Sequence, residues 1–429
     1  MSTLELLLEK VKKNQAIICI LGLGRVGLPL ATIFATKGFK SLGIDIDQKK
    51  LDSIKKSICP FYDPSLQENL KDAINSGRFS VKLTLEKSDV FDILFVTVGT
   101  PTNPDNTTDY SQLYGALEQI SDLDLSGKMI ILRSTLPVKT TDEIVIPFLR
   151  EKTKLVAGKD FGISVCPERI LEGKAIKEIQ ELPEIIGGFN EISRNIASEL
   201  FLKINPNKEI LFTNTSGAEL AKLFTNIYRY INFALANEFA IWAEKYNLDA
   251  FKIINIVNHN YSRCNIPIPG FAGGPCLSKD GILLENNTTF SSIVSTAWKV
   301  NESIPSHIVN NLKQIAGNLF NKKIAILGIS FKAGSDDVRN SPSVKLTEIL
   351  KSAGAKVLIH DPYVKHTHSL SEVLKEPEIV ILATNHSVFK NKINEIRNSG
   401  CKIVYDVWNV YEKTDFPNSK YFSFGNGFF

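Results

Sequence analysis

The feature that most restricts the fold of this chain is a series of short apolar runs, separated by helical segments, within residues 16–200. Five of these runs are predicted strands, and they read AIICILGLG, KSLGIDID, DILFVTVGT, KMIILRST and FGISVCPE. Continuous runs rich in Ile, Val and Leu are typical of parallel strands that are buried on both faces. Because parallel strands need crossover connections, this half of the chain is predicted to form a doubly wound α/β sheet.

The same pattern returns toward the C-terminus. It comprises KKIAILGISF, the helical segment SVKLTEILKSAG, and the later strands AKVLIHDP, EIVILATNH and CKIVYDVWN. Between the two patterns, residues 214–247 are apolar at nearly every third or fourth position and contain no proline. Such a stretch predicts one long central helix that also offers apolar surface to a second subunit.

Composition excludes several classes of protein. A formal charge of +4 over 429 residues is too small for a nucleic-acid or membrane-surface protein, which gathers basic residues on one face. The six cysteines form no C-x-x-C pair, so neither a disulfide framework nor a metal site is expected. No run approaches the roughly 18 apolar residues of a spanning helix, and residues 1–15 are typical of an amphipathic helix rather than a secretory signal. We therefore expect a cytoplasmic protein without membrane insertion.

The first apolar run ends in GLGRVG, which is followed by the helical segment PLATIFATKG. In this context Gly22 permits a tight turn, Gly24 lets the backbone approach a pyrophosphate, and Gly27 lets the helix pack on the strand. The phosphates would lie at the helix N-terminus, so Arg25 and Val26 are assigned to the cofactor site together with the glycines. The alternative is a closely packed strand-to-helix turn that binds no ligand.

A carboxylate follows the second predicted strand. Asp45 stands about 20 residues beyond the glycines, where an acid can accept hydrogen bonds from both ribose hydroxyls. An acid at this position repels a 2′-phosphate, which favours NAD over NADP. Asp47 is the competing candidate, although it is also placed to cap a helix. Thr100 in VGTPTNP and Thr135 in RSTLP end two further strands and are assigned to the ligand site or, alternatively, to turns or caps.

These motifs lead to a domain plan. A chain of 429 residues exceeds what a single hydrophobic core usually supports. We predict an N-terminal NAD-binding Rossmann domain over residues 1–206, a helical middle and dimerisation domain over 207–310, and a second α/β domain over 311–429. The fold class is then α/β, with two Rossmann-like doubly wound domains joined by a long central helix and a helical middle domain.

The segment IPIPGFAGGPCLSKD, residues 266–280, places one cysteine among glycines. Glycines let backbone and substrate approach closely, and Cys276 and Asp280 share a helix face if LSKD begins a helix. A helix N-terminus and the neighbouring Lys279 would both lower the pKa of the Cys276 thiol toward the reactive range. The other cysteines are interpreted as structural, and they are Cys19, Cys59, Cys166, Cys264 and Cys401.

Two polar residues stand out in the predicted long helix. Lys222 and Asn226 are four residues apart in an otherwise apolar stretch. This spacing puts both on one face of the helix, so both side chains can project into one cleft. The alternative is a lysine that extends its ammonium group to solvent beside a polar neighbour.

Taken together, the motifs resemble the UDP-sugar 6-dehydrogenase family, which comprises the UDP-glucose and UDP-N-acetylhexosamine dehydrogenases. The resemblance covers nearly the whole chain after the first helix and rests on GLGRVGLPLA, VGTPT, RSTLP, PERILEG, AKLFTN, GFAGGPCLSKD and FKAGSDDVRNSPS in this order. It implies NAD as cofactor, a homodimer, and a UDP-sugar bound by the domain over 311–429. The implied reaction is a four-electron oxidation of the sugar C6 alcohol to a uronate through a cysteine thiohemiacetal and thioester.

The resemblance also implies residue roles by motif match. Cys276 would be the nucleophile, with Lys222 and Asp280 positioning water and handling protons. The further catalytic residues would be Glu168, Thr135 and Asn226, although Glu168 is alternatively an ordinary acid at a helix start. The residues assigned to the substrate are Glu168, Arg169, Lys222, Asn226, Arg263, Gly273 and Lys332. The residues assigned to the cofactor, besides the glycine motif and Asp45, are Thr100, Thr135, Lys279 and Arg339.

The sequence mixes features of two branches of this family. CPER around Glu168 and SRCNI around Arg263 look like the N-acetylhexosamine branch, whereas the C-L-x-K-D ending at Asp280 looks like the UDP-glucose branch. The expected substrate is a UDP-N-acetylhexosamine of the ManNAc or GlcNAc type, with UDP-glucose as the alternative. More distant alternatives are a β-hydroxyacid-type dehydrogenase, which needs neither Cys276 nor a second α/β domain, and a non-catalytic nucleotide-binding regulator.

Overall fold

The computed structural model describes residues 2–103, 105, 107–285 and 292–427. The chain divides into two compact units, Met1–Thr225 and Asn226–Phe429. Helix α9 (Thr215–Lys245) begins in the first unit and ends in the second.

The first unit alternates helices and short strands. Its helices are α1 (Thr3–Lys12), α2 (Gly27–Thr36), α3 (Gln48–Lys55), α4 (Pro64–Asn75), α5 (Ser111–Ser121), the π-helical turn η1 (Thr141–Val145), α6 (Ile146–Thr153), α7 (Ala175–Glu181) and α8 (Glu191–Ile204). Its strands are β1 (Ile17–Leu21), β2 (Lys40–Ile44), β3 (Phe79–Lys82), β4 (Ile93–Val96), β5 (Met129–Leu132), β6 (Gly162–Val165), β7 (Glu184–Gly188) and β8 (Ile210–Thr213).

The second unit starts with helices and continues as an α/β fold. Its helices after α9 are α10 (Ala250–Asn258), α11 (Leu277–Glu285), α12 (Ser292–Ala316), α13 (Pro342–Ser352), α14 (Leu370–Val373), the 3-10 turn η2 (Ser387–Asn391), α15 (Ile393–Asn398) and the 3-10 turn η3 (Lys413–Asp415). Its strands are β9 (Lys323–Leu327), β10 (Lys356–His360), β11 (Ile379–Leu382), β12 (Ile403–Asp406) and β13 (Lys420–Ser423).

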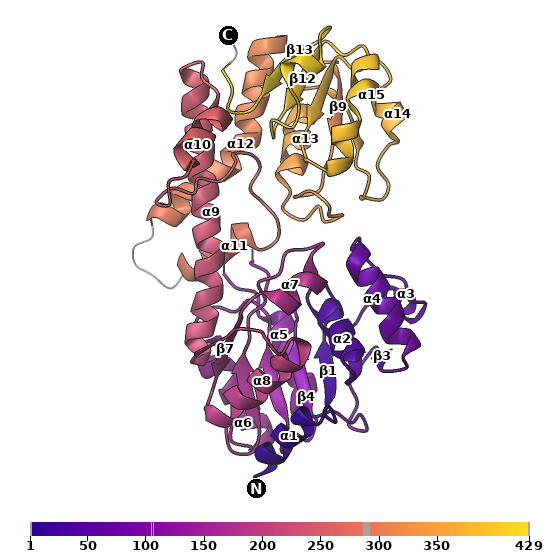
Figure 1. Cartoon of the computed structure of the whole chain (residues 1–429), viewed down its shortest axis with the longest axis vertical. Helices are drawn as coiled ribbons and strands as arrows, with labels where there is room; N and C mark the ends of the chain where they lie inside the picture. The colour runs from indigo at the N-terminus through magenta and orange to yellow at the C-terminus, as the bar shows by residue number, and fades with distance from the viewer. Residues whose placement is uncertain (1, 104, 106, 286–291, 428–429) are drawn as a thin grey trace. The chain divides into compact units, whose positions relative to one another are not determined.

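The sheet of the first unit confirms the predicted doubly wound pattern. Within the described residues its strand order is β3-β2-β1-β4-β5-β6-β7-β8, and the five predicted strands are parallel neighbours (Figure 1). Strands β3, β7 and β8 were not predicted, and β7 runs antiparallel to β6. Strands β7 and β8 lack the continuous apolar run of a strand buried on both faces. Strand β7 ends in two glycines, and the edge strand β8 leaves Leu211 and Phe212 exposed.

Alternate side chains of the central strands enter two separate cores. In β1, Ile18 and Ile20 face one core, while Cys19 and Leu21 face the other. Helices α1, α2, α3, α4, α7 and α8 pack into the first core, and α5 and α6 pack into the second. This two-sided burial is the reason that the strands read as continuous apolar runs.

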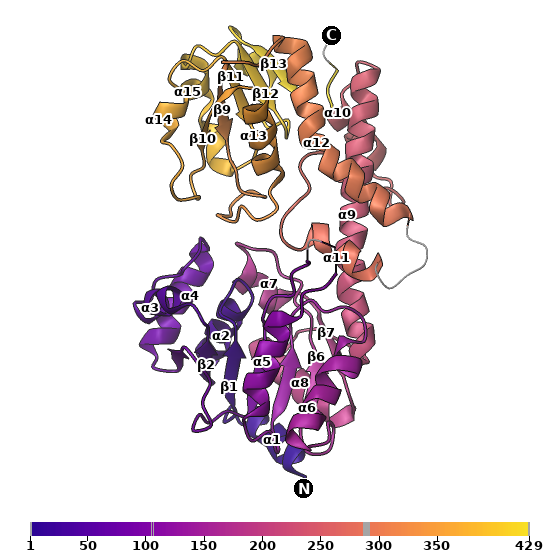
Figure 2. The ribbon, with the colours of Figure 1, turned by 180° about the vertical axis from the view of Figure 1, so that it is seen from behind.

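The second sheet is wholly parallel among its described strands, in the order β10-β9-β11-β12-β13 (Figure 2). The four predicted strands are confirmed, and β13 is an addition at one edge. Helices α12 and α13 supply side chains to the core on one face, and α14, η2 and α15 supply those on the other. The prediction of a second doubly wound domain is therefore confirmed.

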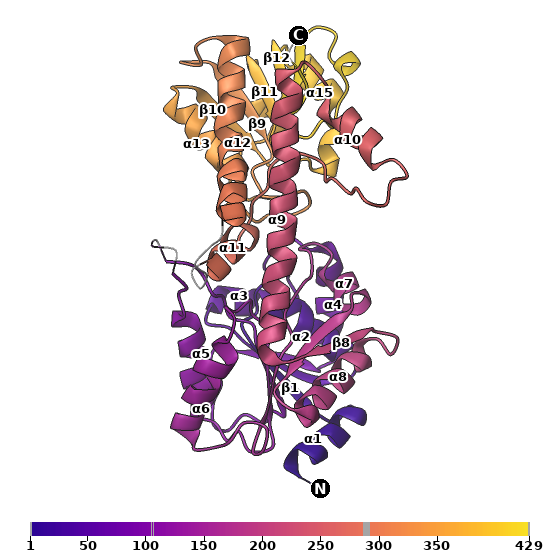
Figure 3. The same cartoon turned by 90° about the vertical axis from the view of Figure 1, so that its left-hand side faces the viewer.

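Helix α9 confirms the predicted long helix, but its two faces are unusual. The buried side carries polar residues, here called the polar stripe: Glu219, Lys222, Asn226, Tyr230, Asn237 and Glu244. The exposed side carries large apolar residues, here called the apolar stripe: Phe224, Tyr228, Leu235, Trp242 and Tyr246. At about 100° per residue the two sets fall on opposite sides of the helix. Figure 3 shows α9 along its length.

The polar stripe begins with a buried carboxylate that fastens α9 to the segment after β5. Glu219 accepts hydrogen bonds from the backbone N–H groups of Lys139 (2.6 Å) and Thr141 (2.9 Å) and from the Thr141 hydroxyl (2.6 Å). Asp142 in turn accepts from the hydroxyls of Thr215 and Ser216 at 2.8 Å. Burial raises the pKa of Glu219 to about 7, against the effect of these hydrogen bonds.

A pH dependence of stability follows for Glu219. Its folded-state pKa of about 7 lies above the ordinary value of 4.5, so folding takes up a proton between these pH values. The free energy of unfolding therefore falls through this group as the pH rises from 4.5 to about 7. In Glu219→Gln, the decrease in unfolding free energy between pH 4.5 and about 7 should be smaller than in the wild type by about 1–3 kcal/mol. Denaturant unfolding at several pH values measures this difference.

Glu143→Gln is the matched control, because Glu143 lies nearby with a side chain that is 64% exposed. Indistinguishable slopes in the wild type and Glu219→Gln would show that Glu219 does not take up a proton on folding.

Candidate active site

The glycine motif between β1 and α2 has the geometry of a phosphate-binding turn. Gly22 adopts φ +93°, and a Cβ on Gly27 would lie 1.9 Å from the Gly22 carbonyl oxygen, so only glycine allows this approach of helix to strand. A Cβ on Gly24 would meet nothing within 4 Å, so the space beside its backbone is open. Val26 gives α2 no side-chain cap, which leaves the helix N-terminus to another acceptor. These residues fit a dinucleotide.

Asp45 lies directly beside this turn. Its Oδ2 accepts hydrogen bonds from the Leu23 N–H at 2.8 Å and from the Lys50 ammonium at 2.6 Å. The competing candidate, Asp47, is the N-cap of α3, where its side chain accepts from the Lys50 N–H. The carboxylate next to the glycines is therefore that of Asp45, as the sequence predicted.

Arg25 links the turn to the PERILEG segment. Its guanidinium lies 3.5 Å from the Glu172 carboxylate and 4.8 Å above the Phe61 ring. The side chain is therefore held by protein groups at the edge of the glycine turn, where its charge can act on a phosphate.

The two predicted threonines come together at the ends of adjacent strands β4 and β5. The Thr100 hydroxyl donates to the Thr135 carbonyl at 2.5 Å, and Thr100 is buried. For Thr100 this contact matches the alternative interpretation, a residue that fastens a turn, because its hydroxyl is already engaged with the backbone.

A buried group of charges surrounds Glu168 in the first unit. Burial raises the pKa of Glu168, while the positive charges of Lys222 and Arg133 oppose the rise. The Glu168 carboxylate accepts from the Ile170 N–H, and Arg169 donates to the Pro183 carbonyl. The structure thus brings Glu168 and Lys222, from two distant motifs, within electrostatic reach of each other.

Arg133 was not predicted and holds this region together. Its guanidinium donates to Glu184 at 2.7 Å and to the Cys166 carbonyl at 3.0 Å, and its own carbonyl accepts from the Glu168 N–H at 3.3 Å. Its position in RSTLP was a signal, but the partner Glu184 is 51 residues away and has no motif.

In the second unit, Asn226 and Asp280 form a buried pair. The Asn226 amide donates to Asp280 Oδ2 at 2.6 Å, and the Lys279 ammonium lies 3.3 Å from Oδ1. Oδ1 is buried and has no hydrogen-bond partner among the described residues. An acceptor of this kind is completed by a water or a substrate group.

Cys276 directly precedes α11, so the prediction that LSKD begins a helix is confirmed. Its carbonyl accepts from the Asp280 N–H at 3.1 Å, and its side chain is exposed. Among the other cysteines, Cys19, Cys166 and Cys401 are buried, as a structural interpretation requires, and burial raises the pKa of the Cys19 and Cys166 thiols. Cys59 and Cys264 are only partly buried, so for them that interpretation is incomplete.

The glycines before Cys276 allow other parts of the protein to approach the backbone closely. A Cβ on Gly270 would lie 2.8 Å from the Trp408 ring, one on Gly273 2.5 Å from Pro342, and one on Gly274 2.6 Å from the Phe331 ring. The space beside these glycines is thus occupied by the α/β part of the second unit. The glycines thus allow close approach of other parts of the protein, and the role of Gly273 in binding substrate stays a prediction.

The remaining predicted residues lie at the surface of the second unit. Arg339 is 62% exposed on its side chain and is oriented by Asp337, with a shortest contact of 2.6 Å. Lys332 is partly buried in the loop between β9 and α13. The exposed Arg263 lies 4.8 Å above the Tyr261 ring.

A buried histidine beneath the Lys332 loop was also missed. His386 Nδ1 accepts from the Gly334 N–H at 3.0 Å, so its proton is on Nε2, which lies 3.1 Å from the Asp361 carboxylate. Although burial acts to raise the pKa of Asp361, its bonds to His386 and to backbone N–H groups lower it to about 2. These residues are remote in sequence from Lys332, and no spacing rule connects them.

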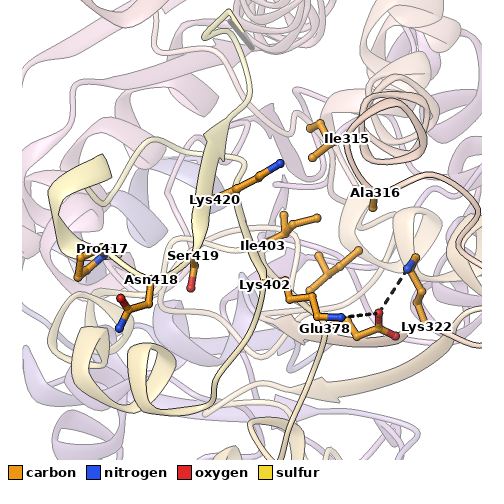
Figure 4. A pocket seen from close by; sticks show the side chains of 11 residues that line it. Ile315, Ala316, Lys322, Glu378, Lys402, Ile403, Pro417, Asn418, Ser419 and Lys420 are labelled. Atoms are coloured by element: carbon orange, nitrogen blue, oxygen red, sulfur yellow. Dashed lines mark hydrogen bonds and ion pairs between the residues drawn. The ribbon is translucent and has the colours of Figure 1, made fainter.

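A cavity of about 600 Å³ lies at the amino ends of the second sheet's strands (Figure 4). Glu378 at its wall pairs with Lys322 at 3.3 Å and Lys402 at 3.9 Å. None of the predicted site residues lines this cavity. It belongs to the opposite edge of the sheet from the Lys332 loop and does not mark the candidate site.

Models of one protein family match most of the chain. They describe the NAD binding domain (residues 16–205), the central domain (216–303) and the UDP binding domain (325–413) of the UDP-glucose/GDP-mannose dehydrogenase family. The chain belongs to this family. It is therefore an NAD-dependent nucleotide-sugar dehydrogenase, as the motifs predicted, and neither a β-hydroxyacid-type dehydrogenase nor a non-catalytic regulator.

Individual relatives match over most of their length. UDP-N-acetyl-D-mannosamine dehydrogenase of Methanocaldococcus jannaschii is 34% identical, with 95% of this chain and 96% of the relative covered. The solved structure of UDP-D-ManNAc dehydrogenase from Pyrococcus horikoshii has a TM-score of 0.89 at 32% identity, covering 96% of this chain and all of that one. A UDP-glucose dehydrogenase from Pyrobaculum islandicum has a TM-score of 0.80 at 26% identity, covering 94% and 97%.

Among the described residues, no helix has both the length and the apolar character that crossing a bilayer demands.

The two glycines of the turn predict different mutant phenotypes. Gly24→Ala introduces no contact within 4 Å, so stability should stay within about 0.5 kcal/mol of wild type. The new methyl group would occupy the space beside the cofactor phosphates and raise the KM for NAD about tenfold. Gly27→Ala should instead destabilise the fold by about 2 kcal/mol or more, because its Cβ overlaps the Gly22 carbonyl. Thermal unfolding and NAD titration of both variants distinguish these outcomes, and a stable Gly27→Ala would refute the packing argument.

Proposed function

We propose that this chain oxidises C6 of a UDP-N-acetylhexosamine, of the UDP-N-acetyl-D-mannosamine type, to the uronate. The observation that carries the mechanism is an exposed Cys276 at the start of α11, one turn before the buried Asp280–Asn226 pair. The sugar is inferred from relatives named UDP-N-acetyl-D-mannosamine dehydrogenase, which match at 33% and 34% identity. The CPER and SRCNI segments support the same branch.

The proposed reaction has four steps at one carbon. The C6 alcohol is oxidised to an aldehyde, and the Cys276 thiolate adds to the aldehyde carbon to give a thiohemiacetal. A second oxidation gives a thioester, and water cleaves it to a carboxylate and the free thiol. When bound, NAD supplies the hydride acceptor for each oxidation. Covalent attachment retains the aldehyde and divides a difficult oxidation into easier steps.

The polar groups are assigned by their surroundings. Asp280, held by Asn226 and with one oxygen lacking a hydrogen-bond partner, would orient a water and accept its proton. Lys222 is 5% exposed, and a buried ammonium stabilises negative charge that develops on the substrate oxygen. Glu168, with a raised pKa, would assist thioester hydrolysis as a general acid or base.

The binding residues are proposed from the same motifs. The NAD site would comprise Gly22, Gly24, Arg25, Val26, Gly27, Asp45, Thr100, Thr135, Lys279 and Arg339. The UDP-sugar site would add Arg169, Arg263, Gly273 and Lys332 to the catalytic residues. We also propose the division into domains over 1–206, 207–310 and 311–429, which the order of the family models supports.

We further propose a cytoplasmic homodimer. The six cysteines are free thiols, which suits a reducing compartment. The apolar stripe of α9 exposes five large side chains in line, with Tyr228 at 68% and Tyr246 at 70%. An exposed apolar stripe of this length is typical of a subunit interface, and a second copy of the same helix would present a matching surface.

The dimer predicts the effect of a charge in the apolar stripe. Trp242→Glu should shift the mass measured by light scattering from dimer to monomer, because a buried unpaired carboxylate opposes association. Val90→Glu is the control, since Val90 is 67% exposed and does not belong to α9. A fully active wild-type protein that is monomeric under the same conditions would refute the dimer.

The reaction predicts a yield of two NADH per sugar. NADH production should be compared for UDP-N-acetyl-D-mannosamine, UDP-N-acetylglucosamine and UDP-glucose, with the largest kcat/KM expected for the first. Cys276→Ser should lower net oxidation by about 10³-fold or more, because the covalent steps are lost. A preference for UDP-glucose would overturn the sugar assignment, and one NADH per sugar or a fully active Cys276→Ser would overturn the covalent mechanism.

A further inference from the structure

The segment that leads to Cys276 is buried although the cysteine itself is exposed. Residues 270–274 have no regular helix or strand, yet all five are buried, and exposure begins at Pro275 and Cys276. An irregular segment that is buried has to satisfy its backbone groups with specific partners. Those partners determine where the thiol stands at the start of α11.

The first partner is Asn237, on the polar stripe of α9. Its Oδ1 accepts a hydrogen bond from the Gly270 N–H at 2.8 Å, and its Nδ2 donates to Asn301 Oδ1 of α12 at 3.0 Å. Asn301 Nδ2 donates in turn to the Tyr230 carbonyl of α9 at 3.1 Å. Asn237 is 0% and Asn301 2% exposed, so water does not compete for these bonds.

Contacts from the α/β part of the unit also hold this segment. The Trp408 ring packs under Gly270 and is itself fixed by its Nε1–H bond to the Ala383 carbonyl at 2.9 Å. The Gly274 N–H donates to the Asn340 carbonyl at 3.0 Å. Asn237 therefore supplies a hydrogen bond from α9 to a segment that residues of the α/β part of the unit also contact.

We propose that Asn237 is a positioning residue for Cys276. Its amide fixes Gly270, and thereby the path of residues 270–275 and the direction of the thiol, without touching a reacting atom. The proposal rests on the nucleophilic role given to Cys276 above, but not on which sugar is oxidised. Attack on a carbonyl depends steeply on approach geometry, and a displacement of about 1 Å can lower a rate about 100-fold.

Loss of the hydrogen bond between Asn237 and Gly270 should lower kcat and leave KM nearly unchanged. The Asn237 side chain makes its described hydrogen bonds to Gly270 and Asn301, and none to the Lys332 loop that is assigned to the nucleotide. Asn237→Ala should therefore lower kcat about tenfold or more while KM for the UDP-sugar stays within about threefold of wild type. Asn301→Ala keeps the hydrogen bond from Gly270 to Asn237 but removes a bond that orients Asn237. Its kcat should therefore lie between those of the wild type and Asn237→Ala.

Asn311→Ala is the matched control. Asn311 is a buried asparagine of α12 that also bridges to α9, donating to Glu244 at 3.2 Å, and its described hydrogen bonds go to Glu244, His307 and Tyr405 rather than to residues 270–276. It should lose thermal stability comparably to Asn237→Ala, because both variants remove buried hydrogen bonds between the helices. It should keep the wild-type kcat.

The experiment makes three kinds of measurement on the full-length wild type and the three variants. These are kcat and KM, the rate of Cys276 alkylation by iodoacetamide without substrate, and amide hydrogen exchange of peptides covering 266–276. Asn237→Ala should exchange faster in this segment and alkylate Cys276 at an altered rate, whereas Asn311→Ala should match wild type in both. If Asn237→Ala does not fold, the same measurements on Asn301→Ala, compared with Asn311→Ala, test the proposal.

Three outcomes would overturn the proposal. The first is a wild-type kcat and KM in Asn237→Ala. The second is a loss of kcat in Asn311→Ala that equals the loss in Asn237→Ala. The third is a rise in the KM of Asn237→Ala at unchanged kcat. A fully active Cys276→Ser would instead remove the nucleophilic role itself. Hydrogen exchange would still report whether Asn237 holds the segment, so the two failures are distinguishable.

Discussion

Helix α9 turns polar side chains toward the protein interior, and each of them needs a partner because an unpaired polar group inside a protein is destabilising by about 1–3 kcal/mol. The partners lie at the start of η1, in the first turn of α11 and in the irregular segment that precedes α11. Glu219 holds the residues around Thr141, Asn226 holds Asp280, and Asn237 holds Gly270. The positions of these segments in the candidate site therefore depend on hydrogen bonds from the polar stripe of α9.

One member of this stripe is an exception. The Tyr230 hydroxyl is buried and has no hydrogen-bond partner among the described residues, and burial raises the pKa of Tyr230 to about 12.

Most of the fold could be predicted from the sequence because strands buried on both faces leave a continuous apolar run. The prediction failed where burial is one-sided or interrupted, as in β8 with its exposed Phe212 and in β7 with its terminal glycines. Within the site, the glycine turn and Asp45 were predictable since their spacing is local. The partners Arg133 with Glu184 and His386 with Asp361 were not, because tertiary structure alone brings them together. For the glycines before Cys276, the sequence indicated close approach but not the partners Trp408, Pro342 and Phe331, since it shows that a side chain is absent and not what fills its place.

The opposed stripes of α9 have a consequence for how this helix can change. Substitution alters one contact, but insertion or deletion of a single residue rotates everything beyond it by about 100°. Such a change between Asn226 and Asn237 would rotate the Asn237 side chain away from Gly270. It would also rotate Trp242 away from the exposed side of the helix. The length of the helix is thus constrained more tightly than its composition, and variation in this region should take the form of exchanged side chains at constant spacing.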